Sequence, residues 1–399
     1  MLTRRGAASL GLTAALIAAA ALFGVQELYA LATAGLLVLG ASTLWAHSRT
    51  WDLAVDRRLV PARVPAGRPA NVEITLSNQL VRPSPVVGVR DPFDGGRSAA
   101  ELLVAPLRAG ENRSATYRLP TAQRGVYVLG PLELVLHDPW GLVSLRRAGA
   151  PRAYLTVHPR VEPLRWLPMI SGNARQDAGG TPAFGRVGEE FFALRDYRSG
   201  DDLRLVHWMS TARLDQLMIR QSESRWRGRL TVVVDLRRSV HDSASLEAAL
   251  SAAASIADTG LRQDVHVRLL TTAGIDSGFG VGPTHRAVVL DALAAASTHP
   301  SGTGYGYPPA DTGPLTFITT AAAQPDELAG LLGAAAPGSR RRAETTVVVI
   351  DRTLTGMAPQ LAGRLAALAG RTVRVAPGGS FGAAWDGALD PRLGAPVRP

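Results

Sequence analysis

The sequence predicts two N-terminal transmembrane helices, then an all-β sandwich domain, then a doubly wound α/β domain. Two uncharged apolar runs lie close together near the N-terminus. Residues that alternate between apolar and polar come next, with frequent turns, and this period of two is typical of antiparallel strands. The last part of the chain alternates short apolar strands with helices, which indicates a parallel sheet covered on both faces.

Residues 1–50 are expected to form a transmembrane helical hairpin. Its apolar runs extend from about residue 7 to 23 and from about 28 to 46. At 1.5 Å per residue each run reaches roughly 25–29 Å, which is enough to cross the hydrocarbon core. A cleaved signal peptide is the alternative, because Arg4 and Arg5 precede the first run. The second run, with no clear small-residue cleavage site before it, favours the hairpin.

Positive charge flanks both outer ends of the hairpin. Arg4 and Arg5 precede it, Arg49, Arg57 and Arg58 follow it, and the connecting turn carries no arginine. Since arginines are retained on the cytoplasmic side of a membrane, both termini are expected in the cytoplasm. We therefore expect a multi-pass protein of the cell membrane, embedded in the lipid bilayer, with the bulk of the chain cytoplasmic.

The region 51–165 is expected to be the β-sandwich domain. Runs such as Val72 to Leu76 alternate apolar and polar side chains between turns rich in Pro, Gly and Asn. Several such strands within about 110 residues fit a sandwich. One strand each is predicted near Glu73, Val87, Thr116, Val128, Leu134 and Leu155.

The remaining chain is divided into a linker with a polar signature segment (166–227), the doubly wound α/β domain (228–377) and a C-terminal tail (378–399). In a doubly wound fold, ligands bind beyond the carboxyl ends of the strands. The predicted strands are 230–234, 265–270, 315–319, 346–350 and 372–375, and the predicted helices are 243–262, 284–297, one after Pro325, and 358–369.

Composition disfavours most familiar enzyme classes. The chain has no cysteine and no lysine, so it lacks disulfides, thiolate zinc sites, a P-loop lysine and a Schiff base. One Gly-x-Ser-x-Gly run, Gly378 to Gly382, is not followed by the histidine that a hydrolase triad needs, and we interpret it as a flexible loop. The net charge is +10, but no recognition module accompanies it, so no nucleic-acid partner is expected.

The densest polar segment of the chain runs from Gly188 to Leu217. Asp201 or Asp202 is expected to cap a helix that runs to about Ala212. Such a helix places three apolar residues on one face: Leu203, Val206 and Met209. A purely structural role is one interpretation, in which ion pairs hold this segment in place. The pairs would be formed by Arg195, Arg198 and Arg213 with Glu189, Glu190, Asp196 and Asp201.

This segment resembles the signature of the domain-of-unknown-function 58 family, a Gly-x-Glu-Phe, Leu-Arg-x-Tyr, Gly-Asp, Arg-x-x-x-Trp, Ala-Arg series. The runs Arg124 to Pro131 and Asp138 to Leu142 look like upstream strands of the same family, so the resemblance covers nearly the whole chain. The matching residues, structural or partner-binding, are Gly188, Glu190, Phe191, Leu194, Arg195, Tyr197, Gly200, Asp201, Arg204, His207, Trp208, Ala212 and Arg213.

The resemblance implies a membrane-anchored protein whose α/β domain is von Willebrand A-like. It also implies neighbours, because such proteins are often encoded beside a MoxR-type AAA+ ATPase and a transglutaminase-like membrane protein. The resemblance therefore predicts the architecture of the chain in more detail than its mechanism.

A von Willebrand A-like domain commonly binds a divalent cation through Asp-x-Ser-x-Ser after its first strand. Here Asp235 and Ser239 match, whereas Arg237 replaces the middle serine. A guanidinium repels a cation and can instead pair with Asp235 in its place. We expect a degenerate site with no bound metal and no other cofactor. Partner binding would then depend on direct contact of Arg237 and Arg238 with an acidic surface.

Two functions from different classes follow. The leading hypothesis is a membrane-anchored, non-enzymatic scaffold that docks a cytosolic partner, first of all a MoxR-type AAA+ ATPase. The alternative is a cell-envelope hydrolase, because the signature segment holds groups that can in principle move protons. Those groups are Glu189, Glu190, Asp196 and His207.

Overall fold

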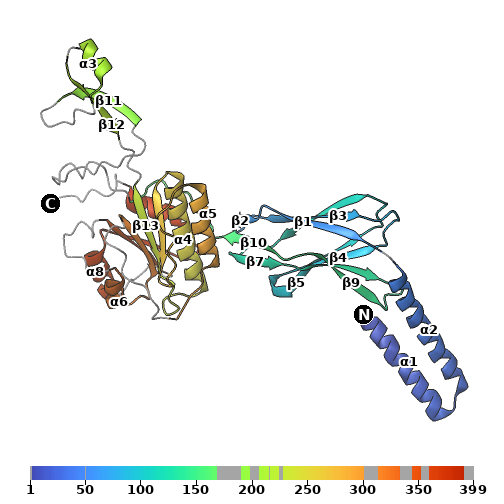
Figure 1. Cartoon of the computed structure of the whole chain (residues 1–399). Helices are drawn as coiled ribbons and strands as arrows, with labels where there is room; N and C mark the ends of the chain where they lie inside the picture. Colours follow the sequence, from blue (N-terminus) through green and yellow to red (C-terminus); the bar gives the residue numbers. More distant parts are fainter. Residues whose placement is uncertain are drawn as a thin grey trace. The chain divides into compact units, whose positions relative to one another are not determined.

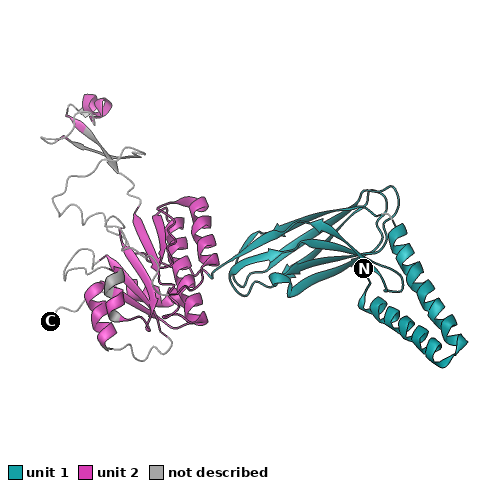
Figure 2. Ribbon diagram, turned by 60° about the horizontal axis from the view of Figure 1, so that its bottom comes forward, with its two compact units in different colours: residues 1–160 teal, residues 161–399 magenta. Residues whose placement is uncertain are grey.

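The computed structural model divides the chain into two compact units, residues 1–160 and 161–399 (Figure 2). Separate hydrophobic clusters form in the two units. The structure describes residues 2–49, 51–168, 190–197, 206–214, 216–223, 228–300, 313–332, 344–351 and 359–390.

Two apolar helices begin the first unit and form an antiparallel hairpin, α1 (Arg4–Phe23) and α2 (Gln26–Ser48) (Figure 1). Helix α1 ends at Gly24, whose left-handed backbone (φ 70°) suits glycine and whose amide donates to Ala20 O. By length and composition both helices can cross a membrane. The predicted pair of N-terminal apolar helices is therefore confirmed, while their orientation in a membrane stays a prediction.

The start of α1 is hydrogen-bonded to the loop at Gly141 and Leu142. Thr3 N donates to Leu142 O (2.9 Å), Thr3 Oγ1 donates to Gly141 O (2.6 Å), and the same hydroxyl caps the helix by accepting from Gly6 N (3.1 Å). A Cβ on Gly6 would lie 2.1 Å from Leu142 O, so only glycine fits there. The hairpin is thus joined to the β-rich region at its base.

Asp138 orders the same loop from inside. Its carboxylate is 4% exposed and accepts from Val143 N (2.7 Å) and Trp140 N (3.1 Å). Burial opposes its ionisation, but hydrogen bonds from Val143 N, the Ser42 hydroxyl and Trp140 N outweigh burial and lower the pKa of Asp138. The carboxylate of Asp138 thus fixes the backbone of the loop from Trp140 to Val143.

The rest of the first unit is β-rich. Its three sheets have the strand orders β1-β3-β6, β2-β10-β7 and β5-β4-β8-β9. Residues from all three, including Ile74, Leu134 and Leu155, share one hydrophobic cluster. The strands are β1 (Leu53–Val60), β2 (Arg63–Pro65), β3 (Ala70–Asn78), β4 (Val87–Phe93), β5 (Ser98–Val104), β6 (Asn112–Leu119), β7 (Gly125–Leu129), β8 (Leu132–His137), β9 (Ser144–Ala150) and β10 (Ala153–His158).

A buried polar cluster joins two of these sheets. Arg57 of β1 donates from Nη1 to Asp91 Oδ1 of β4 (2.6 Å), and Tyr117 of β6 donates to Asp91 Oδ2 (2.7 Å). Both charged side chains are at most 2% exposed. Burial, together with the bond to Asp91, raises the pKa of Tyr117. Arg57 therefore is not a free charge beside the hairpin, although it contributed to the predicted orientation.

Arg58 is also paired, with Asp56 at 2.8 Å, so it too contributes less net charge to the hairpin's flank. The cationic flank consists instead of Arg4 and Arg5 at the start of α1 and of Arg49, whose guanidinium lies 5.1 Å from the ring centre of Trp45. Among the described residues, no carboxylate pairs with Arg4 or Arg5. The charge argument for cytoplasmic termini rests on these three arginines.

The second unit is built on a parallel sheet of order β14-β13-β15-β16-β17. Its strands are β13 (Arg229–Val234), β14 (His266–Thr271), β15 (Leu315–Thr320), β16 (Thr345–Ile350) and β17 (Arg371–Val375). Its helices are α4 (Ser243–Arg262), α5 (Gly282–Ala295), α6 (Pro325–Leu332), α8 (Pro359–Leu368) and α9 (Phe381–Leu389). The predicted α/β region with a parallel sheet is confirmed.

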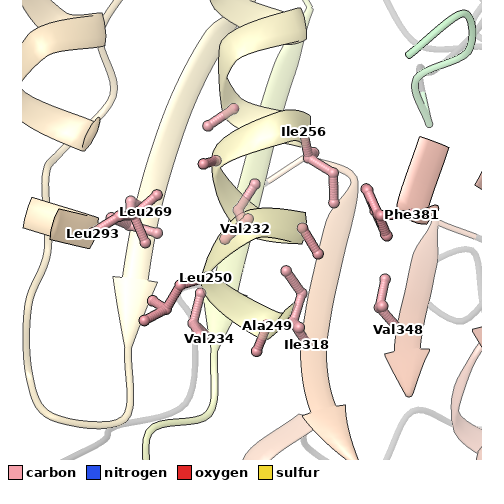
Figure 3. Close-up of a cluster of buried hydrophobic side chains, with 14 of the residues drawn as sticks. Val232, Val234, Ala249, Leu250, Ile256, Leu269, Leu293, Ile318, Val348 and Phe381 are labelled. Carbon is pink, nitrogen blue, oxygen red and sulfur yellow. The ribbon is translucent and has the colours of Figure 1, made fainter. Parts of the chain in front are cut away.

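Alternate residues of each strand face opposite layers. Val232 and Val234 pack with α4, α5 and α9, whereas Val233 packs with α6 and α8. Figure 3 shows part of the first layer, in which Leu250 and Ile256 of α4 share a cluster with Val232 and Ile318 of the sheet. Both faces are covered, which is why these strands read as continuous apolar runs.

Strand order places a topological switch point between β13 and β15. Counted along the chain, the five strands lie in the order 2-1-3-4-5, so the connections from β13 and from β15 leave in opposite directions. A crevice forms beyond the carboxyl ends of strands at such a point, and ligands of open α/β sheets bind there. In this chain the loop after β13 therefore lies where a site is expected.

The interpretation of Gly378 to Gly382 as a flexible loop is wrong for its last two residues, because helix α9 begins at Phe381. Ser380 caps helix α9 by accepting from Ala383 N (3.2 Å), and its hydroxyl donates to Glu162 (2.9 Å). Phe381 and Trp385 of α9 are buried in the sheet's hydrophobic cluster. The expected C-terminal tail thus contains a core helix, whose start was misread because its apolar residues follow a glycine pair.

Candidate functional site

Asp235 follows β13 at the switch point and is completely buried. Its Oδ1 accepts from Arg237 N (3.2 Å) and Nε (2.9 Å), and its Oδ2 accepts from Arg237 Nη2 (2.7 Å) and Thr319 Oγ1 (3.0 Å). A carboxylate offers about four lone-pair positions. These four donors use all of them, so Asp235 has no acceptor position left for another ligand.

Arg237 lies in the position that a cation would need. Its side chain is 10% exposed, and it forms the ion pair with Asp235 that the sequence suggested. The third nitrogen, Nη1, donates to Glu327 of α6 at 2.5 Å. Hydrogen bonding to Asp235 outweighs burial and, with the contribution of Glu327, raises the pKa of the guanidinium. The residue is therefore a permanent positive charge at the end of β13.

Bonds to neighbouring strands hold the loop that carries Arg237. Thr320 Oγ1 donates to Val240 O (2.6 Å), and Leu236 N donates to Thr272 Oγ1 (2.8 Å). Backbone bonds between Leu236, Arg238 and His299 close the other side. The guanidinium is thus placed by a rigid loop. Arg238 in the same loop is exposed, and no carboxylate of the described chain pairs with it.

His241 is a buried polar group beside this cluster. Its ring is 8% exposed, and within the described chain neither ring nitrogen has a hydrogen-bond partner. Burial lowers the pKa of His241, and the negative charge of Asp235 only partly opposes this. The imidazole is therefore neutral at pH 7, and Arg237 remains the permanent cation of the cluster.

Two carboxylates near this edge were not found by sequence reasoning. Glu327 comes from the first turn of α6. Asp351 follows β16, is buried, and accepts from Arg374 of β17 at 2.5 Å. Strand β15 instead ends in hydroxyl groups, and that of Thr319 contacts Asp235. In the described residues no group of three or more His, Asp or Glu side chains could hold a metal ion.

The signature segment forms a small hairpin with one short helix. Strand β11 (Glu190–Asp196) pairs antiparallel with β12 (Met218–Glu223), and α3 (Trp208–Leu214) lies between them in the chain. The predicted helix therefore starts later than expected, at Trp208. Of the predicted apolar face, Val206 is buried but Met209 is 66% exposed. Trp208 is 68% exposed, so this short helix presents two large apolar side chains to solvent.

His207 has a structural role at the start of α3. Its carbonyl accepts from Ser210 N and Thr211 N (both 3.0 Å), and its Nδ1 lies 2.8 Å from Ser210 Oγ. These bonds satisfy free amides of the first turn. Its backbone N donates to Met218 O (2.8 Å), as Tyr197 N does to Leu217 O. The imidazole that the hydrolase alternative requires is thus engaged in capping a helix.

Other signature residues are described only in part. Arg213 and Ala212 are exposed. The carboxylates expected to pair with Arg213 lie outside the described side chains, so that ion pair stays a prediction. For the strand residues only the backbone is described: Glu190, Phe191, Leu194, Arg195 and Asp196. The following lie outside the described residues: Gly188, Glu189, Arg198, Ser199, Gly200, Asp201, Asp202, Leu203 and Arg204.

Part of the second unit matches a known family model. Residues 193–375 match the family described as protein of unknown function DUF58, which confirms the resemblance of the signature segment. No curated protein matches the chain. The match places the signature hairpin and the loop after β13 in one family segment.

Solved structures give low similarities. The chain is similar to the CARDB domain of a Pyrococcus furiosus protein, at 21% identity over 27% of this chain and 86% of that one, with a TM-score of 0.21. It is similar to a beta-glucosidase from Listeria innocua at 15% identity, over 25% of this chain and 16% of the enzyme, with a TM-score of 0.17. The alkylpurine DNA glycosylase AlkC of Pseudomonas fluorescens shares 14% identity over 33% of this chain and 39% of the glycosylase, with a TM-score of 0.19.

Proposed function

We propose that this chain, with its DUF58 segment, is a membrane-anchored, non-enzymatic scaffold that docks a cytosolic partner through a von Willebrand A-like domain. Three features support this. The chain begins with two apolar helices, continues with a β-rich region that we interpret as a sandwich, and ends in an α/β region whose parallel sheet has a topological switch point. A MoxR-type AAA+ ATPase is the first partner to test, because the family resemblance implies such a neighbour.

The main support for the proposal is that every acceptor position of Asp235 is already occupied. A von Willebrand A-like domain commonly holds a divalent cation at this position, but the residues here do not fit one. All four acceptor positions of Asp235 are used, and a fixed guanidinium lies beside it. Magnesium needs several oxygen ligands and gives up water reluctantly. The edge therefore presents a permanent positive charge instead of a bridging ion.

The same bonding argues for recognition instead of reaction. General acid–base catalysis needs a side chain that can gain or lose a proton while touching a substrate. Asp235 is enclosed by donors, and His241 is buried beside it. Arg238 needs no such chemistry to act, because an exposed guanidinium forms charge-assisted hydrogen bonds with carboxylates directly.

Helix α3 supplies a second surface of the kind that binds proteins. Trp208 and Met209 are both more than 60% exposed, at 68% and 66%. Tryptophan is strongly enriched among the residues that dominate binding energy at interfaces, and methionine is also enriched there. We propose that these side chains contact the docked partner as well.

Crosslinking in cells tests the docking proposal. The full chain carries an affinity tag, membranes are crosslinked and solubilised in detergent, and captured proteins are identified by mass spectrometry. We expect an AAA+ ATPase with wild type and at least about fivefold less with Arg238→Gln. Arg371→Gln is the matched control, since Arg371 is also exposed but lies at the amino end of β17. Recovery of no ATPase from crosslinked wild type would refute the proposal.

A further inference from the structure

The three nitrogens of Arg237 have two different kinds of partner. Nε and Nη2 donate to Asp235, only two residues away in the same loop. Nη1 donates to Glu327, which comes from α6, 90 residues further along the chain. The first contact is made within one rigid loop, whereas the second depends on a side chain of another element.

Exposure separates these two contacts further. The Asp235 side chain is completely buried, whereas the Glu327 side chain is 50% exposed. An ion pair with an exposed partner is weak because water and salt compete for its charges. The inner pair is therefore permanent, and the outer carboxylate can leave Arg237 at little cost.

Helix α6 does not depend on the Glu327 contact for its position. Leu328 and Leu332 bury the helix against the sheet, with Leu328 completely buried. The neighbouring carboxylate, Asp326, is 96% exposed and lies 3.5 Å from Arg364 of α8. Release of Glu327 from Arg237 thus requires a side-chain rotation only, with no movement of the helix.

The net charge of this edge rises when Glu327 leaves. With Glu327 bound, the charges of Asp235, Arg237, Glu327 and the exposed Arg238 cancel. Without Glu327, Nη1 of Arg237 lacks this acceptor, and the remaining three side chains carry one positive charge. The ligand that fits this state has at least two carboxylates, one for Nη1 of Arg237 and one for Arg238.

We propose that Glu327 is a built-in competitor that occupies the place of a partner's carboxylate, and that an acidic segment of the partner binds by replacing it on Arg237. This inference rests on the proposed docking function and adds the partner's chemistry and the device that regulates its access. The exchange conserves bonding, because one carboxylate replaces another and Nη1 of Arg237 keeps a hydrogen-bond acceptor. Binding is therefore weakened by Glu327 without being prevented.

Glu327→Gln tests the exchange, because glutamine keeps the size of the side chain but removes the competing charge. The probe is a fluorescein-labelled octaglutamate peptide, titrated against the full chain in detergent and followed by fluorescence anisotropy. If Glu327 covers Arg237 most of the time, the variant binds the peptide about tenfold more tightly than wild type. An octaglutamine peptide of equal length should bind neither protein.

Asp326→Asn is the matched control, since it removes the same charge one residue away from a side chain that does not contact Arg237. We expect less than about a twofold change. Equal tightening by both variants would show general electrostatics and overturn the proposal, as would unchanged affinity in Glu327→Gln. When Arg237→Lys is already present, adding Glu327→Gln should no longer tighten binding, and tightening that persists would also overturn the proposal.

The outcomes separate this inference from the docking proposal. If an AAA+ ATPase is captured in cells while Glu327→Gln leaves the peptide affinity unchanged, the docking proposal is supported. The proposed carboxylate exchange is then contradicted. If Glu327→Gln tightens peptide binding as expected but no ATPase is captured, the carboxylate exchange is supported. The proposal that the docked partner is an AAA+ ATPase is then contradicted. Capture that increases in Glu327→Gln and falls in Arg238→Gln supports both.

Discussion

Thr319 lies near the end of β15 and Asp235 directly follows the neighbouring strand β13, and the threonine hydroxyl donates to Asp235 Oδ2 at 3.0 Å. The bond crosses the switch point, where Val234 of β13 pairs with Ile318 of β15. It occupies the acceptor position that Arg237 leaves on this carboxylate oxygen. A single buried carboxylate thus fixes both the loop after β13 and the arginine that the loop presents.

Replacing Asp235 by asparagine should destabilise the second unit. The substitution keeps the volume but leaves the buried guanidinium of Arg237 without its main counter-charge, which typically costs about 3–5 kcal/mol. Urea unfolding followed by tryptophan fluorescence measures this, because Trp385 is buried in the core of that unit. Asp326→Asn removes a 96% exposed carboxylate and should change the free energy of unfolding by less than about 0.5 kcal/mol. Equal losses in both variants would contradict this account.

Acid should weaken the first unit through Asp138. Because the folded-state pKa of Asp138 lies below its ordinary value of 3.8, ionised Asp138 contributes stability that is present above that value and is lost as pH falls through the folded pKa. Asp138→Asn should reduce the free energy of unfolding at pH 7 by about 1–3 kcal/mol. Unfolding curves measured against pH should converge for the two proteins under acid conditions. Parallel curves would show that the carboxylate's charge does not contribute.

Trp208→Ala should separate binding from folding. The side chain is 68% exposed, so its removal should change the free energy of unfolding by less than about 0.5 kcal/mol. Recovery of the crosslinked partner should nevertheless fall at least about fivefold. Trp140→Ala, which removes another exposed tryptophan in the first unit, should leave recovery unchanged. A similar loss of partner recovery in both variants would show that α3 is not part of the proposed interface.

Fusion reporters test the orientation of the hairpin. Arg4, Arg5 and Arg49 flank its two outer ends, and the turn at Gly24 carries no arginine. A fluorescent protein fused after Pro399 should therefore mature in the cytoplasm, whereas a periplasmic phosphatase fused there should be inactive. An active phosphatase together with a non-fluorescent protein would show that the C-terminus lies outside the cytoplasm. Docking of a cytosolic ATPase would then also be excluded.

Secondary structure could be predicted where the signal is local. Helix α4 has the predicted bounds because Asp242 forms a capping box with Ser245 ahead of a long apolar pattern. Strand β1 was missed because it carries Asp56, Arg57 and Arg58, and a charged run does not look like a strand. It is held by long-range pairing with β3 and by the buried partner of Arg57. Neither interaction is visible in the residues of β1 themselves.

The candidate site likewise has one part that could be predicted from local sequence and one part that could not. Arg237 and Asp235 are two residues apart, so their pairing could be predicted from charge and spacing alone. Glu327 could not be placed, because only the packing of α6 against the sheet brings it to Nη1. A local signal did exist, namely acidic residues in the first turn of a helix that follows a central strand. Such residues lie near the carboxyl edge of a parallel sheet, where the site is.

The central claim is that a guanidinium, and not a metal ion, completes the site after β13. Isothermal titration calorimetry of the full chain in detergent with magnesium chloride tests it most directly. We predict no heat of binding for wild type, because Asp235 has no free acceptor position and Arg237 repels the ion. Arg237→Ser restores a hydroxyl ligand and should give at most weak binding. Binding of magnesium by wild type at about micromolar concentration, lost in Asp235→Ala, would contradict the account.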